Sequence, residues 1–201
     1  MRFFTPTPED DSLGVFVSVR QWYKQPKMRR LVSEGVDWCI DNDAYSRGFM
    51  PDEFFPWLES VKAYRDTCLF VAVPDVVGDS IQTLDNWRHW LRFFDGWPVA
   101  FVAQDGQENL PLPTDYDALF VGGTTEWKVS PGAVQCIKRA QSNGKHIHIG
   151  RVNWLRRYNL FRVLDGSDSF TCDGTRSRFD GREKTHAKWK EYMAQEPLVA
   201  I

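Results

Sequence analysis

Eight short apolar segments, rich in β-branched and aromatic residues, recur along this chain, and six of them end in a polar residue or a glycine pair. They predict strands over residues 1–4, 14–19, 37–41, 69–74, 99–104, 118–122, 146–150 and 169–173. Segments of helical length separate most of these strands, over residues 23–34, 51–65, 79–95, 130–143, 152–165 and 182–194. Because strands that alternate with helices form parallel sheets, and eight such strands are enough to close on themselves, we expect an α/β fold, a small (β/α)8 TIM-type barrel.

Two connections, 6–13 and 107–117, are too short and too rich in proline to hold full helices. We therefore expect a barrel in which one or two helices are shortened or missing. At 201 residues the chain suits a single domain over 1–201 with a sizeable core. An open doubly wound sheet is the competing architecture, but the segment nearest to its G-x-G-x-x-G fingerprint, VGGTTE at 121–126, does not match.

The composition is that of an ordinary globular protein, with 42% hydrophobic and 26% charged residues. No apolar run approaches the roughly 20 residues of a membrane-spanning helix, and the first residues lack the apolar stretch of a signal peptide. The four cysteines are scattered, and none forms a C-x-x-C pair. These features predict no membrane association, a cytoplasmic location and unpaired thiols in a reducing compartment.

Charge is distributed unevenly along the chain. Residues 138–190 hold 13 Lys and Arg against 5 Asp and Glu, a surplus of +8, so the net charge of −2 leaves −10 for the rest. A basic C-terminal quarter suits a polyanionic partner such as nucleic acid. Helices that carry solvated Lys and Arg have the same composition, and the sequence does not decide between the two explanations.

In a parallel barrel the carboxyl ends of the strands lie on one face and build the active site. The residues expected there are carboxylates, amides, glycines and one arginine: Asp41, Asn42, Asp75, Gln104, Asp105, Gly122, Gly123, Gly150, Arg151 and Asp173. Several carboxylates and an amide on one rim indicate an enzyme. A structural explanation stays open for each residue, because Asp and Asn also favour turns and helix caps, and paired glycines favour tight turns.

Two histidines share one side of a predicted strand, because His146 and His148 alternate with isoleucines. No H-E-x-x-H pattern and no third clustered histidine accompanies them, so we expect no metal site and a structural or substrate-contacting role. Arg151 follows at the start of a predicted helix, where an arginine is suited to bind phosphate. Glu126 and Lys128, which follow the paired glycines, are expected to be solvated.

Six segments, taken in order, resemble the tRNA-guanine transglycosylase superfamily. The closer resemblance is to its DNA-modifying branch, the DpdA-type 7-deazaguanine transglycosylases of phages and bacterial modification islands. The segments are IDNDAYS (40–46), VPDVVGD (73–79), FVAQDG (101–106), LFVGGTTEWK (119–128), HIHIGRVN (146–153) and DSFTCDGT (168–175). The GG-T-x-E-W-K and H-x-G-R-V-N patterns within them are the most diagnostic, and together the segments span most of the chain.

The resemblance implies a barrel enzyme that exchanges guanine in a polynucleotide for a 7-deazaguanine base, such as 7-cyano-7-deazaguanine, without a cofactor. It implies that Asp173 is the nucleophile, with Asp168 as the fallback, and that Asp41 transfers protons near the base. Asp75 and Gln104 would read the purine edge. The other implied substrate-binding residues are the backbone donors to the base carbonyl, Gly122 and Gly123, together with Asn42, His148 and Arg151.

Two departures from the tRNA enzymes favour DNA as the polynucleotide. Their aspartate motif continues with Ser-Gly-Gly, whereas Asp41 is followed by Asn-Asp-Ala here, and their cysteine-rich zinc site has no counterpart because no cysteine follows Cys172. We therefore expect a metal-free pentosyltransferase that acts on DNA in a bacterial or phage-infected cell. The sequence leaves open whether it works as a homodimer or with helper proteins, although its nine tryptophans leave room for an apolar interface.

The mechanism implied is a double displacement at the sugar carbon C1′, first by Asp173 and then by the incoming base, on a nucleotide that has left the helical stack. Two alternatives stay open. A hydrolytic nucleosidase or glycosidase would use the same two carboxylates, and a non-catalytic nucleic-acid-binding barrel would depend instead on Arg151, Arg156 and Arg157.

Overall fold

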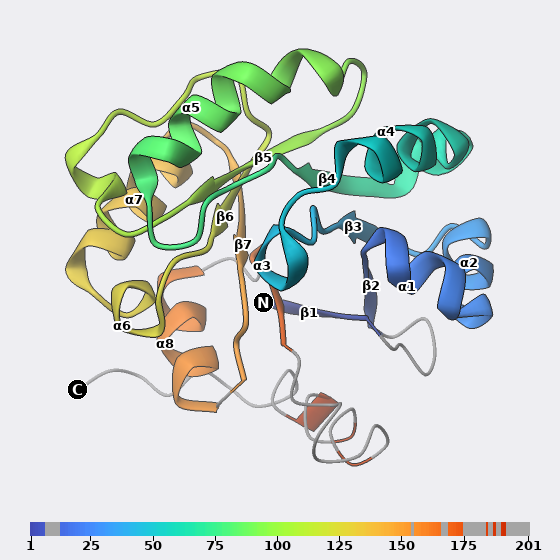
Figure 1. Cartoon of the computed structure of the whole chain (residues 1–201). Helices are drawn as coiled ribbons and strands as arrows, with labels where there is room; N and C mark the ends of the chain where they lie inside the picture. Colours follow the sequence, from blue (N-terminus) through green and yellow to red (C-terminus); the bar gives the residue numbers. More distant parts are fainter. Residues whose placement is uncertain are drawn as a thin grey trace.

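Eight parallel strands close into a barrel in chain order, with β8 pairing to β1 (Figure 1). The computed structural model describes residues 1–6, 13–153, 155–165 and 169–174, together with positions 184, 187, 190 and 191. The strands are β1 (Arg2–Thr5), β2 (Gly14–Val17), β3 (Trp38–Ile40), β4 (Cys68–Ala72), β5 (Val99–Ala103), β6 (Ala118–Val121), β7 (His146–Ile149) and β8 (Thr171–Asp173). All eight predicted strands are present, and the predicted (β/α)8 TIM-type barrel is confirmed.

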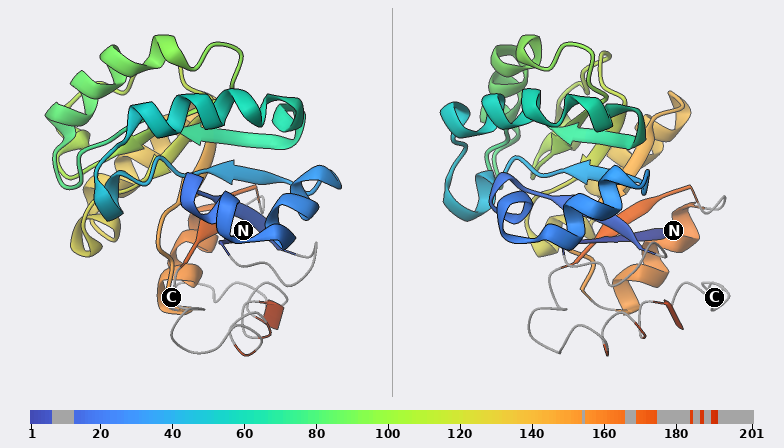
Figure 2. Two further views of the ribbon diagram at one scale, coloured as in Figure 1. Left: turned by 45° about the vertical axis from the view of Figure 1, so that its right-hand side comes forward. Right: turned by 90° about the vertical axis from the view of Figure 1, so that its right-hand side faces the viewer.

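Helices lie outside the strands, as the turned views in Figure 2 show. They are α1 (Val19–Lys24), α2 (Pro26–Ser33), α3 (Ala44–Arg47), α4 (Pro51–Ser60), α5 (Ser80–Trp90), α6 (Thr125–Lys128), α7 (Pro131–Ser142) and α8 (Leu155–Asp165). Between β5 and β6 only the short 3₁₀ helix η3 (Gln107–Asn109) occurs, so the predicted shortening of that connection is confirmed. The connection from β1 to β2 and the predicted helix over 182–194 fall largely outside the described residues.

The helices differ from the sequence prediction at their ends. The helix predicted over 23–34 is two helices, because Pro26 lacks an N–H and starts α2 at its first position. The helices predicted over 51–65 and 79–95 finish as 3₁₀ helices, η1 (Lys62–Thr67) and η2 (Leu91–Phe93). The one-turn helices α3 and α6 were not predicted, because four residues are too few to show a helical period.

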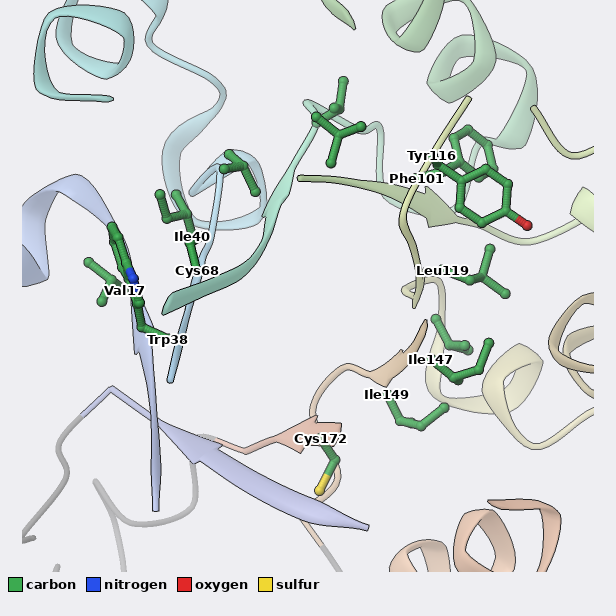
Figure 3. Packing of buried hydrophobic residues seen from close by; sticks show 14 of the residues in the cluster. Val17, Trp38, Ile40, Cys68, Phe101, Tyr116, Leu119, Ile147, Ile149 and Cys172 are labelled. Carbon is green, nitrogen blue, oxygen red and sulfur yellow. The ribbon is translucent and has the colours of Figure 1, made fainter. Parts of the chain in front are cut away.

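Side chains alternate between the barrel interior and the layer beneath the helices. The outward layer joins strands and helices in one apolar cluster, part of which is drawn in Figure 3 with Ile40, Leu119 and Ile147 among the labelled residues. A second cluster fills the barrel interior and contains Phe4, Phe16, Cys39, Phe70, Ala100 and Ala118. This interior cluster lies beneath the carboxyl ends of the strands, so the polar residues at those ends sit on top of a packed apolar interior, as in other barrels of this type.

All four cysteines lie within the described residues, and each is buried and free. Burial raises the pKa of the Cys68 thiol well above its usual range. These thiols therefore act as small apolar side chains of the two layers. In the part of the chain that the structure describes, no helix is long and apolar enough to cross a membrane.

Candidate active site

The carboxyl ends of the strands open onto a cavity of about 910 Å³, large enough for a nucleotide-sized ligand. Eight of the nine predicted site residues line this cavity: Asp41, Asn42, Asp75, Gln104, Gly122, Gly123, Arg151 and Asp173. They come from loops and strand ends after β3, β4, β5, β6, β7 and β8, so segments far apart in sequence meet there. The fallback nucleophile, Asp168, lies outside the described residues.

Asp173 ends β8 and is 5% exposed, with its side chain on the interior side of the barrel. Its Oδ1 accepts two hydrogen bonds, from the backbone N–H of Arg151 at 2.9 Å and from His148 Nε2 at 3.2 Å. Its Oδ2 has no hydrogen-bond donor among the described residues. The carboxylate is therefore held through one oxygen while the other is left for a ligand.

His148 supports Asp173 from below. Its ring is fully buried, with centroids 4.7 Å from Phe120 and 5.5 Å from Phe16. This burial lowers the pKa of His148, although the hydrogen bond to Asp173 opposes the shift. We assign a neutral ring whose Nε2–H donates to Asp173 and whose Nδ1 accepts from Thr171 Oγ1 at 2.8 Å. The predicted contact of His148 with substrate does not fit, because the ring lies beneath the cavity and not in its wall.

His146 completes this chain of hydrogen bonds. Its Nε2 lies 2.8 Å from the same Thr171 oxygen, and burial lowers its pKa to about 4. A neutral His146 donates to Thr171, Thr171 donates to His148, and His148 donates to Asp173. Every donor in the chain is used, so the two histidines hold the Asp173 carboxylate in one orientation.

Asp41 lies at the end of β3, where its backbone N–H donates to Val17. Its Oδ1 accepts the backbone N–H of Asp43 at 3.2 Å. Burial raises the pKa of Asp41 to about 7, and the nearby carboxyls of Asp43, Asp173 and Asp75 add to the shift. Near neutral pH this carboxyl can therefore both give and take a proton.

Asp75 is held between two amides. Asn42 Nδ2 donates to its Oδ1 at 2.9 Å, and Gln104 Nε2 donates to its Oδ2 at 2.6 Å. Asn42 also donates to Val73 O, while Gln104 Oε1 accepts from the backbone of Gly78 and Gly123. Burial raises the pKa of Asp75, and the hydrogen bond from Asn42 opposes the shift. Asn42 and Gln104 thus fix Asp75, whose remaining lone pairs can accept from a ligand.

The paired glycines have a structural function. Gly122 N donates to Ala103 O at 3.0 Å and Gly123 N donates to Gln104 Oε1 at 2.8 Å. Neither amide is free, so their predicted role as donors to a base carbonyl does not fit this structure. A Cβ atom on Gly122 would lie 2.6 Å from Gln104 Nε2, which is too close. A glycine is therefore needed here to leave space for the Gln104 amide.

Arg151 spans the mouth of the cavity. Its guanidinium donates to Gly123 O at 3.0 Å and lies 4.3 Å from the ring centroid of Tyr45, on α3. Its backbone is left-handed, with φ of 57°, and in this conformation its N–H donates to Asp173. Because α8 begins at Leu155, Arg151 is not in the first turn of a helix, as the phosphate-binding prediction required. Arg151 therefore holds the Asp173 carboxylate through its backbone and connects Gly123 to Tyr45 through its side chain.

Lys128 was missed by the sequence analysis, which expected it in solvent. It is the last residue of α6, is 2% exposed and lines the cavity. Burial lowers its pKa to about 7, the charge of Arg151 lowers it further, and Asp173 opposes the shift. Thr124 is a good N-cap and could have indicated the start of α6, but a cap does not show that Lys128 is buried.

Among the described residues, no group of three His, Cys, Asp or Glu side chains could hold a metal ion. The chemistry available there is that of carboxyls, amides, an amine and a guanidinium. No protein-family model matches this chain, and no curated protein matches it either. Function is therefore inferred from the geometry and charge of the cavity.

Proposed function

We propose that this protein exchanges guanine in DNA for a 7-deazaguanine base through a covalent aspartyl-sugar intermediate. The observation that carries the proposal is one cavity with two different carboxyls, Asp173 with a free oxygen and Asp41 with a pKa of about 7. A double displacement at a glycosidic carbon needs an oriented nucleophile and an acid–base group that titrates near the working pH. The resemblance of the site segments to guanine transglycosylases supports the same reaction.

Recognition of the base rests on Asp75. A carboxylate accepts hydrogen bonds from the N1–H and 2-amino group of guanine, and the amides of Asn42 and Gln104 hold Asp75 ready for this. Guanine and 7-deazaguanine share that edge and differ only at position 7. One site therefore accepts both the departing and the incoming base, which an exchange reaction requires.

The flat faces of the base need an apolar partner. Tyr45 lines the cavity with 67% of its surface exposed, and the planar Arg151 guanidinium already lies against its ring. Aromatic rings at such positions stack on bases whatever the sequence. Because the cavity is enclosed by the barrel rim, a base in DNA has to leave the helical stack to reach it.

The reaction has two balanced halves. In the first, Asp173 Oδ2 attacks C1′, the C1′–N9 bond breaks with its electron pair on guanine, and protonated Asp41 gives the departing base a proton. In the second, Asp41 takes the N9 proton of the incoming 7-deazaguanine, N9 attacks C1′, and the ester to Asp173 breaks. Both carboxyls return to their starting states, and no water is consumed.

DNA as the polynucleotide is supported by the departures from the tRNA enzymes and by the basic surplus of residues 138–190. The described part of 138–190 holds nine Lys and Arg against two Asp and so carries +7 of that surplus, although Arg151 lies in the cavity and the buried Arg162 is unavailable to a surface partner. The strength of DNA binding is therefore a separate matter from the chemistry of the cavity.

Nucleoside mass spectrometry tests the proposal. DNA and tRNA are incubated with the protein and a panel of 7-deazaguanines, digested and analysed. We expect a deazaguanine deoxynucleoside in DNA, no change in tRNA, and no product with Asp173→Asn. Asp85→Asn, at an exposed carboxylate on α5, is the matched control and keeps full activity. Release of guanine without incorporation would instead identify a hydrolase.

A further inference from the structure

Lys128 lines the cavity but has no role in the reaction described so far. Its side chain is 2% exposed, and it comes from α6, directly after the turn at Gly122 and Gly123. Within the described residues, no hydrogen bond or ion pair to its amine is present. Burying an amine without a partner is costly, and a bound ligand that accepts from the amine removes that cost.

Several charged groups lie near enough to this amine to change its pKa. Its charged neighbours come from different elements: Arg151 after β7, Asp173 on β8, Arg157 on α8 and Asp105 after β5. Its own charge lowers the pKa of Asp75 and of His148 in return. Lys128 therefore lines the same cavity as Asp173 and Asp75, close enough for its charge to act on both carboxylates.

A guanine or 7-deazaguanine bound through Asp75 still has a carbonyl oxygen that needs a hydrogen-bond donor. Its carbonyl oxygen is adjacent to the N1–H that Asp75 accepts, and an acceptor buried without a donor weakens binding. The backbone amides of Gly122 and Gly123 are already used within the protein, and that of Thr124 donates to Asp105 at 2.8 Å. Lys128, one turn further along, has donors to spare.

We propose that the amine of Lys128 donates a hydrogen bond to the carbonyl oxygen of the bound purine, and that it is thereby a further catalytic residue. This inference rests on the proposed function. When the C1′–N9 bond breaks, its electron pair delocalises onto the base and increases the negative charge on that oxygen. A donor fixed at this oxygen stabilises the transition state more than the bound substrate, as in an oxyanion hole. Asp41 still supplies the proton.

Binding of free bases tests the contact without requiring turnover. The ligands are 7-deazaguanine and 2-amino-7-deazapurine, which lacks the carbonyl oxygen. The proteins are wild type, Lys128→Met, and Lys138→Met at an exposed lysine as the control. Methionine has a similar length and no charge, so Lys128→Met removes a buried amine and is expected to fold at least as well as wild type.

Calorimetry is expected to show that wild type and Lys138→Met prefer 7-deazaguanine. Lys128→Met is expected to lose roughly 10- to 100-fold of that preference, the value of a hydrogen bond from a charged donor. The base without the carbonyl, 2-amino-7-deazapurine, also lacks N1–H. This loss weakens its binding to all three proteins alike, so it cancels when the preference of a variant is divided by that of wild type. An unchanged preference in Lys128→Met refutes the role of Lys128 alone. Failure of wild type to bind either base refutes the proposed function and this inference together.

The exchange reaction gives a second readout. Asp41 and Lys128 must both be protonated, so the wild-type rate is expected to fall by roughly 100-fold per pH unit well above pH 7. Arginine does not titrate in this range, so Lys128→Arg is expected to retain activity and to fall only about tenfold per pH unit. A pH limb of unchanged steepness in Lys128→Arg would overturn the assignment.

Discussion

Replacing Gln104 tests how the site holds its shape. Its Oε1 accepts from the N–H of Gly123 at 2.8 Å and of Gly78 at 2.9 Å, and its Nε2 donates to Asp75 at 2.6 Å. Leucine has a similar size but no polar atoms, so Gln104→Leu leaves the buried Gly123 N–H without an acceptor, at about 1–3 kcal/mol. Gly78 is exposed and can turn to water, so its bond adds only about 0.5–1.5 kcal/mol.

We therefore expect Gln104→Leu to lower the free energy of unfolding by about 2–4 kcal/mol with an unchanged denaturant slope. Urea unfolding followed by tryptophan fluorescence measures this. We also expect base affinity to fall, because Asp75 loses one of its two supports. A loss of less than about 0.5 kcal/mol would refute the reasoning, since it would mean that the Gly123 N–H finds another partner.

Glutamate at the same position separates the acceptor from the donor. Gln104→Glu keeps the bonds from Gly78 and Gly123 but brings a second carboxyl against Asp75. Above the pKa values of this pair the two charges repel, whereas at lower pH one proton is shared between them. The variant is therefore expected to approach wild-type stability as the pH falls from 7 toward 5. A stability gap that stays constant over that range would contradict this arrangement.

Three further predictions concern the carboxyls and their support. Asp173→Asn is expected to abolish exchange with a wild-type circular dichroism spectrum, and retained activity would remove Asp173 from the role of nucleophile. Asp41 has a folded-state pKa raised to about 7, so the folded state binds more protons and its stability falls as pH rises from about 4 to 7. Asp41→Asn is expected to flatten that slope in pH-dependent urea titrations, and an unchanged slope would show that Asp41 is not the titrating group. His148→Phe places an apolar ring among four phenylalanines, Phe4, Phe16, Phe70 and Phe120, and removes the hydrogen bonds to Asp173 and Thr171. It is expected to slow exchange about 10- to 100-fold while melting within a few degrees of wild type, and a normal rate would show that His148 does not position Asp173.

The fold follows from the sequence because strand length, β-branched content and helical spacing are local properties. Each strand, such as Val99–Ala103 or Ala118–Val121, reads as a short apolar run between turn residues, and counting eight of them is enough to predict closure. The rim residues follow for the same reason, since the strand direction decides which end of each run reaches the active-site face. Helices of one turn, such as α3 and α6, leave no periodic signal.

The hydrogen bonds of the site could not be predicted in this way. Sequence shows that Gly122 and Gly123 end a strand, but their amides are taken by Ala103 and by Gln104, which comes from another loop. The sequence also shows that His148 lies on the same side of its strand as His146. It does not show that the His148 ring packs between phenylalanines and bonds to Asp173. The burial of Lys128 depends in the same way on how α6 closes over the rim. These features are set by contacts between distant segments.

Trapping the covalent intermediate tests the central claim most directly. The protein is mixed with a guanine-containing DNA oligonucleotide in the absence of any incoming base, quenched in acid and analysed by intact mass spectrometry with peptide mapping. We expect an adduct whose mass is that of protein plus oligonucleotide minus guanine, located on Asp173, absent from Asp173→Asn and discharged into modified DNA when a 7-deazaguanine is added. Release of guanine with no adduct on Asp173, or an adduct that persists in Asp173→Asn, would contradict the account.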